Sequence, residues 1–303
     1  MDERTEVELA QDLRESRRIL RRIQAHITQA HRNLGAEMHD MGLIVVLYHA
    51  DNDLPPLNCV IPRRKTAWLP AQEITAGLDF LRERGKTPRL HLIEGLYPPR
   101  FVESLHAVGL NLECTVNLMA HAAPSAVTGD RTDTTTDAGD SAALWEKVRG
   151  GDGYRVIAGG IEPIDIRREN APPPATQHDV VIGDVVIGDV VIGDVENAPS
   201  GIARVTFDQD SAHIATAAIA TGNSENEAKR IAALYRQALS VAAARGCELV
   251  FTAGSDEATR RIYRRLGFVD AGNLICYAQN DTTNRESAQQ TDGNSGGTAL
   301  FMA

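Results

Sequence analysis

The stretch TRRIYRRLGFVDAG, residues 259–272, decides the fold. It predicts a short helix over residues 256–266 that ends at Gly267, because glycine readily adopts the left-handed conformation that follows many helices. The strand LICYA, residues 274–278, is expected to come next. A helix, a glycine stop and a last strand therefore close this folded block.

The residues before this stretch predict two paired strands, a long helix and a further strand. Residues 200–221 are typical of two antiparallel strands joined by a turn at Asp208 to Asp210. A helix is expected over 224–245, ending at Gly246, and CELVFTAG (247–254) predicts the next strand. This order indicates an α+β domain with a mixed sheet flanked by helices.

A tyrosine followed by Leu-Gly-Phe, placed after this order of elements, resembles the GCN5-related N-acetyltransferases. The resemblance implies the acyl-CoA N-acyltransferase fold, with acetyl-CoA as co-substrate and a small-molecule or peptide amine as acceptor. It also implies that Tyr263 is the general acid that protonates the departing thiolate. Asp256 takes the place of an asparagine that the family often has near the cofactor. The residues that would lend backbone groups to the pantetheine arm are Ile219, Ala220 and Thr221.

The segment TGNSENEAKRIAAL (221–234) departs from the family's diphosphate loop. The family has Arg or Gln followed by glycines three and five residues on, and these positions become Glu225, Ala228 and Arg230 here. Ser224 and Glu227 form a capping box, whose side chains would satisfy the amide groups that a diphosphate needs. The positive charges of Lys229 and Arg230 could offset the loss of these amide contacts to a diphosphate. The segment implied to contact the cofactor is Ala228, Lys229, Arg230 and Ile231.

The general base is open between two residues. His213 lies in the strand HIATAAIA, and Glu225 lies at the loop. Either side chain could relay a proton from an amine, although a single histidine in a strand often has only a structural role. We include His213 with Tyr263 as candidate catalytic residues.

The N-terminal half resembles a degenerate copy of the same unit, and this resemblance predicts a tandem arrangement. Residues 77–95 parallel residues 238–254, and residues 101–110 parallel residues 261–268. This alignment puts Leu105 where Tyr263 stands, so the first copy lacks the acid. We expect an N-terminal half over 1–121, a flexible linker over 122–140, a C-terminal domain over 141–279 and a disordered tail over 280–303.

Two further segments of the N-terminal half are predicted from their patterns. Residues 5–34 form one long helix, because leucines and isoleucines recur at spacings of three, four and seven. Its arginines form either a solvated face or a surface for an anionic partner, and a homodimer through this helix is a further hypothesis. GLIVVLYHA (42–50) predicts a buried strand, and DNDLPPLNCVIP (51–62) an irregular loop.

The composition of the chain limits the classes of partner that we expect it to bind. The chain has 303 residues, a formal net charge of −10 and a hydrophobic content of 43%. An acidic chain is poorly suited to neutralising a phosphate backbone, so we expect no nucleic acid partner. The charged N-terminus lacks the apolar core of a signal peptide and no segment is apolar enough for a membrane span, so we expect a cytoplasmic protein with no membrane partner. The four cysteines are predicted to be small buried side chains.

Residues 180–194 repeat VVIGD three times. A period of five conflicts with the period of two in a strand, so successive copies present opposite faces. We expect one copy to pair in a sheet, and deletion of one copy to leave folding intact.

Two functions remain open from the sequence. One is N-acetyl transfer from acetyl-CoA to an amine. The other is a catalytically degenerate binding or sensing module that keeps the fold without acetyl-CoA turnover. The intact YRRLGF segment (263–268) favours the first, and the altered diphosphate loop favours the second.

Overall fold

The computed structural model describes residues 6–63, 69–122, 145–148, 150, 154–159, 161, 177–182, 201–221, 224–254 and 256–279. The helices are α1 (Glu6–Asn33), α2 (Ala71–Glu83), α3 (Pro99–Ala107), α5 (Ser224–Ala244) and α6 (Glu257–Arg265), with a 3-10 turn η1 (Pro55–Leu57). The strands are β1 (Glu37–Met41), β2 (Ile44–Tyr48), β3 (Cys59–Pro62), β4 (Arg89–Ile93), β5 (Leu110–Ala122), β6 (Tyr154–Ala158), β7 (Gln177–Ile182), β8 (Gly201–Asp208), β9 (Ser211–Ala220), β10 (Leu249–Gly254) and β11 (Val269–Gln279).

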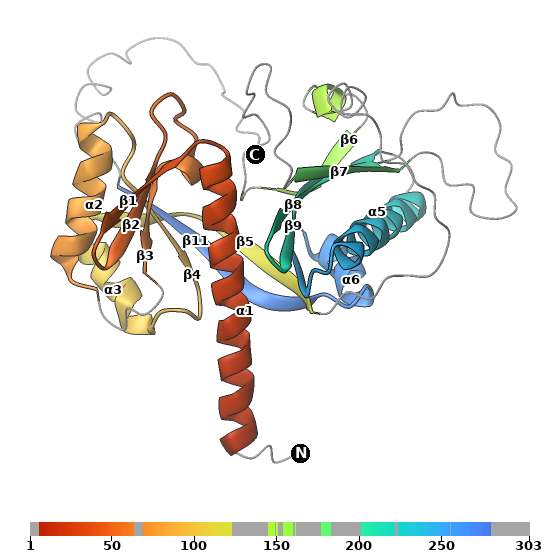
Figure 1. Ribbon diagram of the computed structural model, residues 1–303, viewed down its shortest axis with the longest axis horizontal. Helices are drawn as coiled ribbons and strands as arrows, with labels where there is room; N and C mark the ends of the chain where they lie inside the picture. Colours follow the sequence, from red (N-terminus) through yellow and green to blue (C-terminus); the bar gives the residue numbers. More distant parts are fainter. Residues whose placement is uncertain are drawn as a thin grey trace, which may run out of the picture.

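All of these strands belong to one 11-stranded mixed sheet. Its order is β1-β2-β3-β4-β11-β5-β10-β9-β8-β7, and β6 pairs with β9 off this path. Helix α1 stands between two lobes, with α2 and α3 in one lobe and α5 and α6 in the other (Figure 1). The predicted mixed sheet flanked by helices is therefore confirmed.

Alternating strand residues build a core on each face of the sheet. In β10, Val250 packs in the cluster that includes residues of α5 and α6, whereas Leu249 and Phe251 pack in the cluster that includes α1. The same alternation in β4 directs Leu90 toward the α2 and α3 cluster and Ile93 toward α1. Helix α1 thus covers one face of the sheet, and the other helices cover the opposite face.

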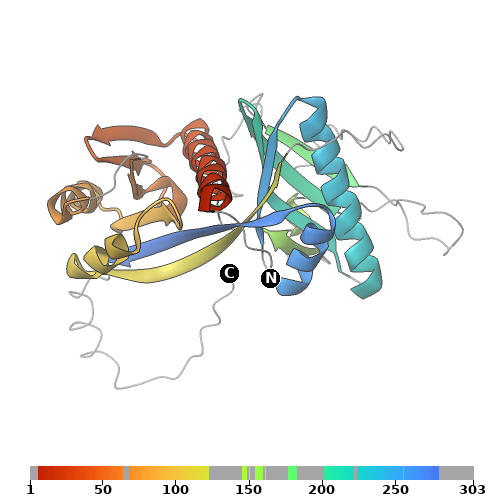
Figure 2. The same ribbon diagram turned by 90° about the horizontal axis from the view of Figure 1, so that it is seen from below.

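The two lobes repeat one unit and exchange a strand. The unit runs β3-α2-β4-α3-β5 in the first lobe and β9-α5-β10-α6-β11 in the second, and its first two strands are parallel in both. Gly109 and Gly267 end the two short helices at φ 75° and 93°. Strand β5 lies between β10 and β11, and β11 lies between β4 and β5. Figure 2 shows these two long strands spanning both lobes.

Two predictions of local structure are corrected, and one strand was missed. The buried strand expected at 42–50 is confirmed as β2, but the sequence did not predict β1, which forms a hairpin with β2 through a turn at Gly42 with φ 79°. The loop expected at 51–62 contains β3, whose ladder to β2 and β4 is not visible in a local pattern. The last strand is longer than residues 274–278, because β11 pairs along most of β5.

Other predictions lie wholly or partly outside the described residues. These are the linker at 122–140, of which only Ala122 in β5 is described, and the tail at 280–303. Within the repeat, Val180, Val181 and Ile182 pair with β8, and the remaining copies lie outside the described residues. None of the described helices carries the apolar run that a bilayer crossing would require.

Candidate functional site

The candidate site lies where β9 parts from its parallel neighbour β10. Residues Ser211 to Ile214 of β9 pair with Leu249 to Thr252 of β10. The register of β8 with β9 then shifts, so that Ala215 is an extra residue in β9. Such a bulge bends and twists its strand. Beyond it, β9 pairs with β8 on one edge, and the edge that faced β10 is left for another partner.

Strand β6 takes that edge. It pairs antiparallel with β9, with Tyr154 opposite Ala220 and Arg155 opposite Ile219. Ile157 and Ala158 of β6 are buried in the core beneath α5. The backbone of Ile219 is therefore flanked by β8 on one side and β6 on the other, and Ala220 pairs with β6. The groove between β9 and β10 is filled by the chain itself.

Tyr263 points into this groove from α6. Its side chain is 0% exposed, and its hydroxyl donates a hydrogen bond of 3.1 Å to the carbonyl of Ile157 in β6. Its ring stacks on Tyr235 of α5 with a centroid separation of 4.2 Å. Burial and then the neighbouring Tyr235 raise the pKa of Tyr263 well above its ordinary value, so the hydroxyl keeps its proton.

Arg155 ties β6 to the start of both helices. Its guanidinium lies 3.0 Å from the carboxylate of Glu227 in the first turn of α5. It also lies 3.5 Å from Asp256, the residue before α6. Asp256 caps that helix, because its carboxylate accepts hydrogen bonds of 2.8 Å from the backbone amide and from the hydroxyl of Thr259. The carboxylate implied to lie near a cofactor therefore binds its own helix and β6.

The segment that replaces the diphosphate loop also makes contacts within the protein. The guanidinium of Arg230 donates to the carbonyl of Ala220 at 3.1 Å and so folds back over the end of β9. Ile231 is buried in the core, Ala228 is half-buried, and Lys229 and Thr221 are exposed. The predicted capping box rests partly on Ser224, whose side chain lies outside the described residues. The side chain of Glu225, the second candidate base, also lies outside the described residues.

His213 is separated from the other candidate residues by the sheet. Tyr263 packs in the α5 and α6 core together with Ala212 and Ile214 of β9, the neighbours of His213. His213 points to the opposite face, where it stacks on Phe251 at 4.3 Å and contacts the ring of His26 from α1. The structure therefore brings Tyr263 and Asp256 to one groove and leaves His213 under α1.

Acetyl-CoA does not fit this arrangement. A pantetheine arm needs free backbone groups on the open edge of β9, and β6 has paired with that edge. A diphosphate needs close approach to the backbone amides at the start of α5. The carboxylate of Glu227 places negative charge there, and the guanidinium of Arg155 pairs with that carboxylate.

Sequence reasoning missed Arg155 and the position of β6. The apolar residues in YRVIA (154–158) are compatible with a strand, and these residues form β6. Its pairing partner depends on a groove built from residues far along the chain. The one local signal is an arginine within an apolar strand, which is also typical of an exposed edge.

Comparisons with known proteins support the fold. No protein-family model matches the sequence, and no curated protein matches it. A GCN5-related N-acetyltransferase from Kribbella flavida is similar in structure, with a TM-score of 0.63, 17% identity, and coverage of 88% of this chain and 98% of that one. A GCN5-related N-acetyltransferase from Sphaerobacter thermophilus matches at TM-score 0.51 and 16% identity, covering 79% of this chain and 81% of that one.

A functionally unknown conserved protein from Staphylococcus epidermidis ATCC 12228 also matches, with a TM-score of 0.51, 9% identity, and coverage of 81% and 94% of the two chains. The chain has the fold of the GCN5-related N-acetyltransferases, as its YRRLGF segment predicted. Identities of 17% and below leave the chemistry to be argued from the residues of the site.

Proposed function

We propose that this chain is an N-acetyltransferase-fold protein whose acyl-donor groove is filled by its own strand β6. It acts as a binding or sensing module that does not turn over acetyl-CoA in the described conformation. The observation that carries the proposal is the pairing of β6 with residues Ala217 to Ala220 of β9, on the edge that the resemblance assigns to the pantetheine arm.

Three further contacts support the same conclusion. Tyr263, the implied general acid, donates its hydroxyl to the carbonyl of Ile157 and is enclosed by the core. Arg155 holds Glu227 and Asp256 at the starts of the two helices. The glycines that admit a diphosphate are replaced, and the side chain of Arg230 lies over the end of β9.

A second hypothesis is N-acetyl transfer from acetyl-CoA to an amine. The observation that favours it is the hydroxyl of Tyr263, which the resemblance assigns as the general acid and which lies at β6 within the groove. This hypothesis requires β6 to leave the groove, because the hydroxyl is otherwise held by a backbone carbonyl. An amine acceptor belongs to this second hypothesis alone.

Isothermal titration of the full chain with acetyl-CoA and with CoA, at low and moderate salt, tests the proposal. The wild type is expected to show no heat of binding up to millimolar ligand. A saturable isotherm with a micromolar dissociation constant would overturn the proposal, because a ligand of that affinity cannot share the edge of β9 with β6.

The Arg155→Glu variant separates the two hypotheses. It places a third carboxylate beside Glu227 and Asp256, so repulsion favours release of β6. Micromolar binding by this variant alone would support the second hypothesis, in which β6 is displaceable. The matched control is Arg264→Glu, because Arg264 is also 40% exposed and also pairs with two carboxylates, Glu257 and Asp270, away from the groove.

A further inference from the structure

Two cysteines face each other across the exchanged strands. Cys114 of β5 is the direct antiparallel partner of Cys276 of β11. Directly opposed residues in antiparallel strands have Cα atoms about 4.5 or 5.5 Å apart, depending on the type of pair. Both separations fall within the range of about 4.4 to 6.8 Å that a disulfide spans. The register therefore brings the two thiols within bonding reach whichever type of pair they form.

The two thiols differ in exposure, which corrects the prediction that all four cysteines are buried. Cys114 is exposed, whereas Cys276 is 5% exposed and packs in the α1 core. A hydrogen bond with Cys276 lowers the pKa of Cys114 to about 7. The same bond and burial raise the pKa of Cys276. Cys114 is thus an accessible thiol that is partly ionised near neutral pH, with a protonated thiol beside it.

A bulge and an ion pair shape the surroundings of this pair. The register shift after Cys276 leaves Glu113 unpaired in β5, and Glu113 lies 2.9 Å from Arg89 of β4. Glu113 raises the pKa of the Cys114 thiol, and Arg89 lowers it by a smaller effect. Within the described residues, no group of three or more histidine, cysteine or acidic side chains is placed to hold a metal ion. The direct pairing of Cys114 with Cys276 places two thiols side by side, which gives the pair the chemistry of a dithiol.

We propose that Cys114 and Cys276 form a thiol–disulfide exchange site, with Cys114 as the attacking thiol and Cys276 as the resolving thiol. The substrate class is a small disulfide oxidant. The product is a cross-strand disulfide that links a strand of one lobe to the strand it received in exchange from the other.

The reaction proceeds in two balanced steps. The Cys114 thiolate attacks one sulfur of the oxidant, a protein–oxidant disulfide forms, and the oxidant's other half leaves as a thiolate. The Cys276 thiol then loses its proton and attacks the sulfur of Cys114, and the second half leaves. Two cysteine thiols and one disulfide molecule become one protein disulfide and two small thiols.

The remaining cysteines provide internal controls. Cys59 is buried in β3, and burial raises the pKa of its thiol to about 12. Cys247 is 6% exposed between α5 and β10, and burial raises its pKa as well. Both thiols are expected to react at least about tenfold more slowly than Cys114, because the thiolate is the nucleophile.

The test is oxidation of the reduced full chain with oxidised glutathione, followed by thiol counting in denaturant and mass spectrometry of the digested protein. The wild type is expected to fall from four free thiols to two and to yield a peptide linking Cys114 with Cys276. The Cys247→Ser control is expected to form the same link.

The Cys276→Ser variant distinguishes the two roles. It is expected to stop at a glutathione adduct on Cys114, because the resolving thiol is gone. The proposal is overturned if the oxidised wild type keeps four thiols or forms a different link. It is also overturned if Cys276→Ser gains no adduct on Cys114. Because the wild-type link is read directly, a variant that fails to fold does not leave the proposal untested.

Discussion

Replacement of Tyr263 by phenylalanine separates the structural role of its hydroxyl from a catalytic one. The ring stays packed, and the loss of the hydroxyl removes its hydrogen bond to the carbonyl of Ile157 and its hydrogen bond with Tyr235. A buried hydrogen bond contributes about 0.5 to 1.5 kcal/mol when its loss leaves no group unpaired, whereas a loss that leaves a buried carbonyl without a partner costs about 1 to 3 kcal/mol. Because the side chain is fully buried, water cannot replace the lost donor without entering the core. We therefore expect unfolding free energy to fall by about 1 to 3 kcal/mol.

The assay is urea unfolding followed by circular dichroism at neutral pH, with the slope compared between variants. Tyr235→Phe is the matched control, because Tyr235 is equally buried and packs on the same ring. Its hydroxyl bonds with Tyr263, which keeps its bond to Ile157, and with Thr252, whose own hydroxyl still donates to the carbonyl of Ile214. The control is expected to lose about 1 kcal/mol, near the value of a hydrogen bond whose partner stays satisfied.

A loss below about 0.5 kcal/mol for Tyr263→Phe would refute the reasoning, because that is less than one buried hydrogen bond is expected to contribute. Such a result would mean that the carbonyl of Ile157 does not depend on this hydroxyl and that β6 is not held by α6.

Two further predictions concern the N-terminal lobe. Gly77→Ala is expected to lower unfolding free energy by about 1 kcal/mol or more, because the added Cβ would lie 2.5 Å from Ile44 and 3.0 Å from Val60. Helix propensity alone predicts that Gly77→Ala raises the unfolding free energy. Urea unfolding measures the change, and a rise would contradict the close packing of α2. The pKa of His91 is lowered from 6.5 to about 3, by burial first and then by His31 and Arg89. Between pH 6.5 and about pH 3, His91 is therefore protonated in the unfolded chain and neutral in the folded chain. Because the unfolded state binds more protons, the unfolding free energy falls as pH falls through this window. His91→Asn is expected to flatten the pH dependence of the urea midpoint between pH 6.5 and about 4.5, and an unchanged slope would contradict it.

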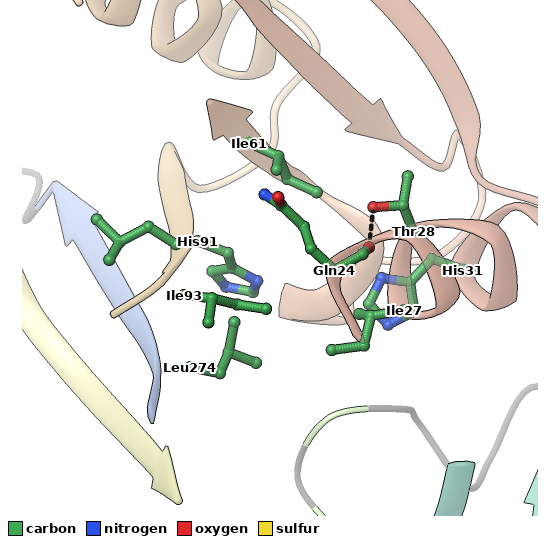
Figure 3. Close-up of a pocket in the computed structure, with 9 residues that line it drawn as sticks. Gln24, Ile27, Thr28, His31, Ile61, His91, Ile93 and Leu274 are labelled. Carbon is green, nitrogen blue, oxygen red and sulfur yellow. Dashed lines mark hydrogen bonds between the residues drawn. The ribbon is translucent and has the colours of Figure 1, made fainter. Parts of the chain in front are cut away.

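The environment of His91 gives this pH prediction its physical basis. Figure 3 shows His91 and Gln24 reaching toward the space between α1 and β4. The Nε2 atom of His91 and the Oε1 atom of Gln24 are buried and have no hydrogen-bond partner among the residues that the structure describes. They line a cavity with Ile61 and Leu274 whose volume is about 20 Å³, close to the space of one water molecule. A proton added to His91 there gains no carboxylate partner among the lining residues.

Much of the fold could be predicted from the sequence because its signals are local. Helices α2, α5 and α6 each end beside a glycine with positive φ, at Gly85, Gly246 and Gly267. The parallel between the two halves was visible in the same glycines, and the structure repeats the unit accordingly.

The exchange of β5 and β11 and the position of β6 could not be predicted, because each is a pairing between distant segments. A strand pattern gives the faces of a strand and does not give its neighbours. Ala215 shows the limit clearly, since this one extra residue directs β9 away from β10 and changes which side chains share a face. His213 and Tyr263 therefore could not be assigned to the same or to opposite faces from alternation alone.

Peptide-resolved hydrogen exchange of the ligand-free full chain tests the central claim most directly. If β6 fills the groove, the amides of residues 154–158 are protected at least about 100-fold relative to an unstructured peptide, together with those of β8 and β9. Exchange of residues 154–158 at the rate of an unstructured peptide, while β8 and β9 stay protected, would contradict the claim and leave the groove open for an acyl donor.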